Sequence, residues 1–193
     1  MSSLHPDFKP LTYRLAWDGD FSVTPPKPQR AEITEEQKKA VRTLLRAGGY
    51  KPSGRGRPAS ESLVKAFHDG RFPEIHPVVD FFNWLSMETG LPISVLDEDL
   101  VVGDWEFRLG EIGESYIFNP SGQELKVEGL LLLADQDGAT GSPVKDAQRT
   151  KISETTRTFL VVVWGTAELP ESLSRAAKEI EEWSSRLHLV SVS

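Results

Sequence analysis

The sequence contains no cysteine, so the chain has neither a disulfide framework nor thiol chemistry. No apolar run approaches the ~20 residues that a helix needs to cross a bilayer. The longest runs, 130–134 and 159–164, have the length of buried strands. The first ten residues, MSSLHPDFKP, lack the basic segment followed by an apolar one that marks a secretory signal. We therefore expect a cytoplasmic protein that makes no contact with a membrane.

Several site signatures are also missing. The four histidines show no metal-ligand spacing, so we expect no metal site and no cofactor. There is no G-x-S-x-G elbow, and GATGSPVK (138–145) lacks the glycine-lysine-serine/threonine ending of a phosphate-binding P-loop. No familiar catalytic nucleophile can be identified from these patterns.

Basic residues are in the minority, with 22 Lys and Arg against 29 Asp and Glu and a formal net charge of -7. Such a chain does not bind nucleic acid indiscriminately through its overall field, and contact with a polyanion requires a local basic patch. The length of 193 residues, with 38% apolar and 26% charged residues, fits one globular domain with a real core.

The chain order predicts an α+β fold. We expect residues 1–30 to form an extended lead-in packed on the body, because TPPKPQ (24–29) excludes regular helix, and residues 31–193 to form a single domain. Helices are predicted from Thr34 to the glycines at 48 and 49, from Ser60 to the Asp69-Gly70 stop, from Val78 to Glu88, and after Pro170. Strands are predicted at 93–96, 105–109, 125–127, 130–134 and 159–163, with DQDGATGSP (135–143) as a hairpin tip. Helices followed by strands and one last helix indicate a mixed or antiparallel sheet flanked by helices.

The segment YKPSGRGRPASESL (50–63) gathers Lys51, Arg55 and Arg57 on a loop just before a predicted helix. Glycines bring backbone N–H groups close to an anion, the helix dipole favours negative charge, and arginine forks bind phosphate or carboxylate. Gly54, Gly56 and Ala59 imitate a dinucleotide fingerprint only weakly, since no apolar strand precedes them. A solvated loop whose charges serve solubility is the alternative, and it stays open.

A second cationic segment, PVKDAQRTK (143–151), carries Lys145, Arg149 and Lys151 against one acid, Asp146. It follows the predicted hairpin and should lie on a loop, where functional groups are common. The alternative is an exposed connector in which an Asp146–Arg149 pair contributes little stability.

The stretch HPVVDFFNWLSMETG (76–90) offers His76, Asp80 and Asn83. Asp80 and Asn83 are one helical turn apart among apolar neighbours, so at least one should face the interior and be hydrogen-bonded. Taken alone, this pattern favours a structural cap or a buried hydrogen bond.

Four segments together resemble a known family. FPEIHPVVDFFNWLSMETGLPISVLD (72–97) and SGQELKVEGLLLLAD (121–135) are similar to the editing part, the B3/B4 domain, of the bacterial phenylalanyl-tRNA synthetase beta subunit. KPSGRGRPASESL and PVKDAQRTKISETT resemble freestanding B3/B4 proteins, and the resemblance covers most of residues 34–190. It implies an α+β domain that hydrolyses tRNA carrying the wrong amino acid.

The resemblance also marks departures. The family's threonine-asparagine pair is Phe82-Asn83 here, its histidine position is Ser94, and its editing glutamate has no counterpart in QDGATGS. Amino-acid specificity, and with it catalysis, is therefore open.

The resemblance implies roles for residues of both cationic segments. An aminoacyl ester is already activated, so hydrolysis needs a positioned water and a stabilised oxyanion but no covalent nucleophile. Asn83 and Ser94 would orient the water or the ester. Lys145 or Arg149 would stabilise negative charge or hold the terminal phosphates, and Asp146 would pair with the substrate's ammonium group. The residues assigned to binding of the tRNA acceptor end are Lys51, Ser53, Arg55, Arg57, Glu61, Arg149 and Lys151.

Three functions remain open from the sequence. The first is a trans-acting aminoacyl-tRNA deacylase. The second is a noncatalytic module that binds tRNA or an aminoacylated ligand. The third is an enzyme or sensor for a free amino acid or a phosphorylated metabolite, because a fold does not by itself determine function.

Overall fold

The computed structural model describes residues 4–19, 24–29 and 31–192. In this part of the chain the α-helices are α1 (Glu35–Leu45), α2 (Ala59–His68), α3 (Pro77–Thr89) and α4 (Pro170–Arg186). Short 3-10 turns occur at η1 (Gly54–Gly56), η2 (Glu98–Leu100) and η3 (Gln148–Thr150). No helix within these ranges is both long and apolar enough to span a membrane.

The described strands form three antiparallel sheets. The largest has the order β2 (Ile93–Asp97), β8 (Thr158–Val163), β1 (Leu11–Trp17) and β9 (Leu189–Ser191). A second sheet has the order β3 (Glu106–Leu109), β6 (Leu131–Asp135) and β7 (Gly138–Gly141), and β4 (Ser115–Ile117) pairs with β5 (Glu124–Lys126). The predicted fold class, α+β with an antiparallel sheet flanked by helices, is confirmed.

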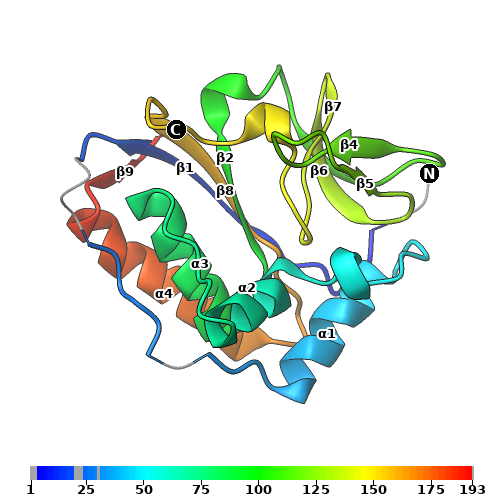
Figure 1. The fold of residues 1–193 in the computed structure, drawn as a ribbon, viewed down its shortest axis with the longest axis horizontal. Helices are drawn as coiled ribbons and strands as arrows, with labels where there is room; N and C mark the ends of the chain where they lie inside the picture. Colours follow the sequence, from blue (N-terminus) through cyan, green and yellow to red (C-terminus); the bar gives the residue numbers. More distant parts are fainter. Residues whose placement is uncertain (1–3, 20–23, 30, 193) are drawn as a thin grey trace.

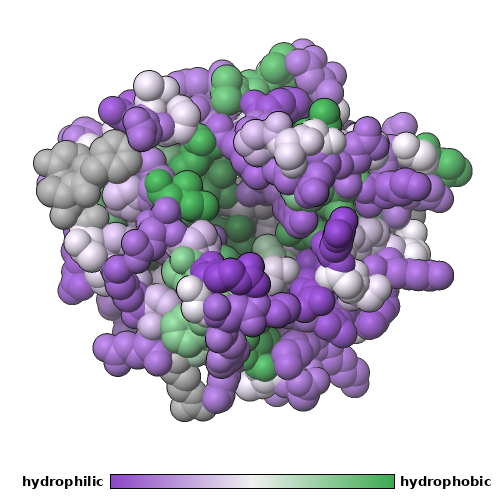
Figure 2. Space-filling model, viewed as in Figure 1, coloured by the Kyte–Doolittle hydropathy of each residue, from purple (hydrophilic) through white to green (hydrophobic). Residues whose placement is uncertain are grey.

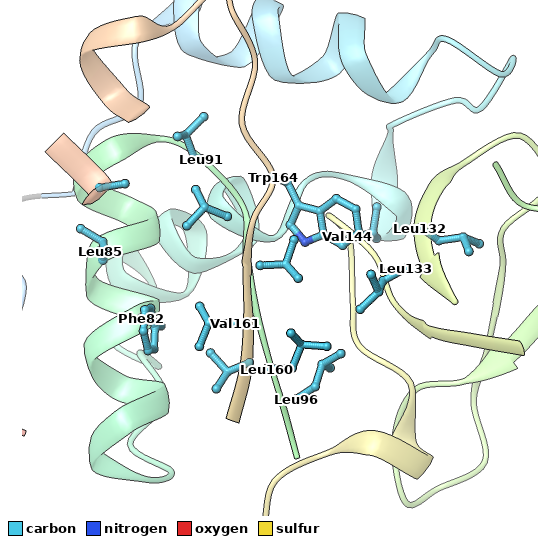
Figure 3. Packing of buried hydrophobic residues seen from close by; sticks show 14 of the residues in the cluster. Phe82, Leu85, Leu91, Leu96, Leu132, Leu133, Val144, Leu160, Val161 and Trp164 are labelled. Carbon is cyan, nitrogen blue, oxygen red and sulfur yellow. The ribbon is translucent and has the colours of Figure 1, made fainter. Parts of the chain in front are cut away.

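Strand β8 lies at the centre of the core. In Figure 1 the four-stranded sheet runs between helices α3 and α4 on one side and the smaller sheets on the other. Figure 3 shows Phe82 and Leu85 of α3 on one side of β8 and Leu96 and Leu133 on the other. Because both faces are covered, every residue from Phe159 to Val163 is buried, and each such side chain contributes roughly 1.5–3 kcal/mol to folding.

The predicted helix boundaries are confirmed in two cases and wrong in one. Thr34 caps α1 through the expected capping box with Gln37. Pro77 occupies the first turn of α3, and Gly90 ends the helix in the left-handed conformation with φ 73°. Ser60, however, is buried inside α2 and does not cap it; Pro58 precedes the helix instead.

Two further predictions need correction or extension. Only the first part of DQDGATGSP is a turn, because Gly138–Gly141 pairs with β6 as strand β7. Residues 11–17 of the expected lead-in form β1, which lies between β8 and β9 and carries the buried Trp17. Residues 1–3, 20–23 and 30 of that segment lie outside the described residues. The boundary at residue 30 stays a prediction.

Candidate functional site

The two cationic segments, 50–63 and 143–151, lie side by side. The backbone N–H of Ala59 donates to the carbonyl oxygen of Pro143 at 2.8 Å, which joins the start of α2 to the start of the second segment. Tyr50 Oη donates to the Gly56 carbonyl at 3.3 Å and so closes the first segment on itself. The charge of Arg55 is close enough to Lys145 to contribute to the lowered pKa of that lysine. Tertiary structure thus builds one basic surface from two distant parts of the chain.

Asp146 lies next to this surface in a mostly dehydrated setting. Burial raises the pKa of its carboxyl group from 3.8 to about 6, although the Ser94 side chain, the Lys151 charge and the backbone of Val95 and Ser142 oppose that shift. Its Oδ1 atom is buried and makes no hydrogen bond of ordinary geometry. A carboxylate whose pKa lies close to physiological pH, and which has one oxygen without a hydrogen bond, can accept a proton from a substrate or a water.

Gly141 at the end of β7 makes room for this carboxylate. A Cβ atom at position 141 would lie 2.6 Å from Asp146 Oδ1, which is a steric clash. The glycine is therefore required for the close approach of Asp146 to the sheet.

Tyr116 and Ser142 fix the backbone that carries Lys145 and Asp146. Ser142 Oγ lies 2.8 Å from Tyr116 Oη, donates to the Lys145 carbonyl at 3.0 Å, and accepts from the N–H groups of Val144 and Lys145 at 3.3 Å. Tyr116 Oη also donates to the Lys145 carbonyl. Burial raises the pKa of Tyr116 strongly, so its phenol stays protonated and acts as a donor.

Two lysines contact Phe118, one at its ring and one at its backbone carbonyl. Lys145 Nζ lies 3.6 Å from the centroid of the Phe118 ring, and Lys151 Nζ donates to the Phe118 carbonyl. Dehydration lowers the pKa of both lysines; the charges of Lys151 and Arg55 lower that of Lys145 further, whereas Asp146 opposes the shift of Lys151. Crowded, partly dehydrated cations of this kind create a positive potential that attracts an anion.

Ser94 links the site to the core. It is 2% exposed on β2, and its Oγ accepts a hydrogen bond from Trp164 Nε1 at 2.8 Å and lies 3.5 Å from the Ser142 carbonyl oxygen. Its hydroxyl is therefore engaged by buried groups, and its position favours an indirect role in orienting Asp146.

Replacement of Ser94 by alanine is expected to lower the free energy of unfolding by ~1–3 kcal/mol, because the buried indole N–H of Trp164 loses its acceptor. The free energy of unfolding of Ser94→Ala is measured by urea denaturation, with Ser174→Ala as the control. Ser174 is exposed on α4, so its replacement should change the free energy of unfolding by less than ~0.5 kcal/mol. Equal stability of the two variants would show that the Trp164–Ser94 bond is dispensable.

Figure 2 shows a hollow at the centre of the face seen in Figure 1, with hydrophobic residues in its depth and hydrophilic residues around its rim. In this projection β2 passes behind the hollow, α3 lies on one side, and the loop after β7 lies on the other. Ser94 belongs to β2, and Lys145 and Asp146 belong to that loop.

A family model described as "B3/4 domain" matches residues 52–187. The chain belongs to the B3/4 domain family. The resemblance seen in the sequence is thereby confirmed, and the matched range contains most of both cationic segments.

Two known proteins show how far the similarity extends. This B3/4 domain is 30% identical over 89 residues to the phenylalanine–tRNA ligase beta subunit of Bartonella henselae, an alignment that covers 45% of this chain and 11% of the relative. A solved N-terminal fragment of the phenylalanyl-tRNA synthetase beta subunit from Pyrococcus horikoshii superposes with a TM-score of 0.45 and 10% identity, over 97% of this chain and 47% of the fragment. The B3/4 domain thus spans only a small part of its curated relative.

Several residues that the sequence analysis assigned to the site do not contact Asp146. Asn83 is partly exposed on α3, and no hydrogen bond within the described residues joins it to Asp146. Arg149 donates to both carboxylate oxygens of Asp135, at 2.9 and 2.6 Å, and to the Gly138 carbonyl at 2.8 Å. The Asp146–Arg149 pair named in the alternative of an exposed connector does not form among the described residues, and the guanidinium holds the β6–β7 hairpin instead.

The remaining binding candidates divide in a similar way. Glu61 makes two hydrogen bonds with Arg42, at 2.7 and 2.6 Å, and so joins α2 to α1. Arg57 donates to the Gly54 carbonyl at 2.7 Å and stabilises its own loop. Lys51, Ser53 and Arg55 are exposed on that loop and open to a ligand.

The sequence alone missed Tyr116, Phe118, Ser142 and Trp164, because their positions carried no motif. Among the described residues, no group of three or more His, Asp or Glu side chains is arranged to hold a metal ion.

Proposed function

We propose that this B3/4 domain is a trans-acting aminoacyl-tRNA deacylase that removes a wrong amino acid from the acceptor end of tRNA in the cytoplasm. The observation that carries the proposal is the proximity of charges: Lys151 acts on Asp146, whose pKa is about 6, and Lys151 and Arg55 both act on Lys145. A carboxylate whose pKa is close to neutral pH can act as a general base in the hydrolysis of an ester. The neighbouring cations can bind the polyanion that carries this ester. Similarity to the phenylalanine–tRNA ligase beta subunit supports the choice of substrate.

The reaction needs one activated water. In this proposal the Asp146 carboxylate takes a proton from a water as the water oxygen attacks the ester carbonyl carbon. Lys145 stabilises the oxyanion that develops, and collapse of the intermediate breaks the bond between the carbonyl carbon and the ribose oxygen. The proton returns to that oxygen, so the products are a free amino acid and uncharged tRNA.

Each neighbouring group has a distinct part in this scheme. Ser94, which accepts a hydrogen bond from Trp164, orients Asp146. Asn83 contacts the substrate from helix α3. Lys51, Ser53 and Arg55 contact the phosphates of the acceptor strand, and Lys151, which donates to the Phe118 carbonyl, acts through its charge on Asp146. Arg57, Glu61 and Arg149 keep the two loops and the hairpin in shape, because their side chains already hold partners of their own.

The test is a panel of correctly and incorrectly charged tRNAs carrying a labelled amino acid, incubated with the protein. Release of label should accelerate for at least one pair and should rise with pH as Asp146 loses its proton near pH 6. The same panel with Gly141→Ala should release label at least ~10-fold more slowly, because the new methyl group displaces the carboxylate. Absence of acceleration for every pair, at enzyme concentrations equal to the tRNA, rejects the proposal.

A second candidate function is binding without turnover. It is favoured by Ser94, which occupies the position of the family's histidine. The Ser94 hydroxyl already accepts a hydrogen bond from Trp164, so it is not available to activate water. Saturable binding of aminoacyl-tRNA, with the ester intact after hours in the complex, would establish it.

A further inference from the structure

A separate pocket lies at the N-terminal end of α3. Its volume is about 470 Å³, and it is lined by residues 24–28 from one part of the chain and by Phe67, residues 72–77 and Asp80 from another. A volume of this size falls within the range of sites that bind small molecules, about 300–1,000 Å³. Ser94, Lys145 and Asp146 do not line it.

The walls of this pocket are apolar and rigid. Five of its lining residues are prolines, contributed by both segments, and two are the aromatic residues Phe67 and Phe72. Proline rings have fixed φ angles, so such a wall loses little conformational freedom when a ligand binds. Ile75, also in the lining, is 65% exposed, which leaves a large apolar side chain without cover at this pocket.

The charged residues of the lining leave one negative charge uncompensated. Lys27 Nζ lies 2.6 Å from Glu74 Oε1, so these two neutralise each other and fasten one segment to the other. His76 is uncharged at neutral pH because burial lowers its pKa to about 4. The carboxylate of Asp80 remains, with Oδ1 accepting from the Ile75 N–H at 2.8 Å.

We propose that this pocket binds a small organic amine, with its aromatic or branched apolar body against the proline and phenylalanine wall and its ammonium group on Asp80. Partial burial raises the pKa of Asp80, so the carboxylate is incompletely hydrated and gains from a cationic partner. A carboxylic acid of the same shape meets repulsion from Asp80, and a neutral alcohol lacks the charge. The inference does not depend on the deacylase proposal.

The probe is 2-phenylethylamine, and the comparison ligands are 3-phenylpropionate and 2-phenylethanol. Each is titrated into ¹³C-methyl-labelled protein, and the NMR resonances of the Ile75 and Ile93 methyl groups are followed. The amine should shift Ile75 saturably with a Kd of roughly millimolar, as expected for a ligand of this size. The acid and the alcohol should bind at least ~10-fold more weakly, in line with the strength of charged hydrogen bonds. Ile93 on β2, outside this pocket, should not move.

Asp80→Asn is the decisive variant, because asparagine keeps the acceptor for the Ile75 N–H and removes only the charge. It should weaken amine binding at least ~10-fold, whereas Asp99→Asn, an exposed acid on η2, should leave binding unchanged. If Asp80→Asn does not fold, Ile75→Ser provides the second measurement, since this exposed residue can be changed without harm to the core. Because this variant lacks the Ile75 reporter, its amine binding is measured beside that of the unmodified protein by isothermal titration calorimetry, and it should again weaken. Equal binding of amine and acid, or retained affinity in both pocket variants, overturns the proposal.

Deacylation by Asp80→Asn is expected to equal that of the unmodified protein, which separates the two functions.

Discussion

Asp146→Asn is expected to reduce deacylation at least ~100-fold, the usual scale for loss of a general base, and to make the folded protein more stable at pH 8. Asparagine has nearly the same shape and can still accept hydrogen bonds from the backbone of Val95 and Ser142. It cannot take a proton from water. The substitution therefore separates the chemistry of the carboxylate from its packing.

The direction of the stability change follows from the pKa. Asp146 has a folded-state pKa of about 6 against an ordinary 3.8, so between these values the folded state binds a proton that the unfolded state does not. Stability contributed by this group is present at low pH and is lost as the pH rises through about 6. The substitution removes this penalty, but Lys151 loses its counter-charge, which offsets part of the gain. A net gain of ~1–2 kcal/mol at pH 8 is expected.

The measurement is urea denaturation of the two proteins from pH 4.5 to pH 8, alongside single-turnover deacylation. The stability difference should grow from pH 4.5 to about pH 6 and then level off, because only between the two pKa values does the folded state bind a proton that the unfolded state does not. The effects of all other carboxylates cancel between the variants. A stabilised variant with full activity would exclude Asp146 as the base.

A modified substrate distinguishes the two possible roles of Asp146. If Asp146 activates water, N-acetylaminoacyl-tRNA, which lacks the ammonium group, should remain a substrate for the unmodified protein. If the carboxylate instead pairs with the ammonium, acetylation should abolish deacylation as completely as Asp146→Asn does.

The double substitution Lys145→Ala and Arg55→Ala has the second largest expected effect. Hydrogen bonds to charged groups contribute ~1.5–3 kcal/mol each, so loss of both cations should lower kcat/KM by roughly 100-fold or more. Arg55→Ala alone should act mainly on KM, since Arg55 lies on the rim. Lys145→Ala should lower kcat as well, because this lysine lies next to Asp146 on the same segment.

Salt dependence provides an independent check of these contacts. Raising the salt concentration should inhibit the unmodified protein, and the slope of log(kcat/KM) against log salt should become shallower by ~0.7–0.9 for each phosphate contact removed. Lys178→Ala, a change of an exposed lysine on α4, is the control and should alter neither slope nor rate. An unchanged slope in the double variant would show that the two segments do not contact phosphate.

Much of the fold could be predicted from local patterns. The capping box at Thr34, the Pro77 start and Gly90 stop of α3, and the apolar runs at 130–134 and 159–164 each depend on a few neighbouring residues, and each occurs close to where it was expected. Strand β1 was missed because its register is set by pairing with β8, more than 140 residues away in the chain. Ser60 was misjudged as a cap because the N-terminal turn of α2 is bonded to Pro143, a partner that no local pattern reveals.

By itself, the sequence determined the family, the α+β class and the two cationic segments, since these follow from composition, short-range order and extended motifs. Only the tertiary structure decided how those cations are used. Arg149 and Arg57 are engaged by partners that hold the hairpin and the loop, whereas Lys151 acts on Asp146, and Lys151 and Arg55 both act on Lys145. The physical reason is that charge, hydration and pKa depend on neighbours in space, and β2, β7 and the loop after β7 become neighbours of the α2 start only when the chain folds.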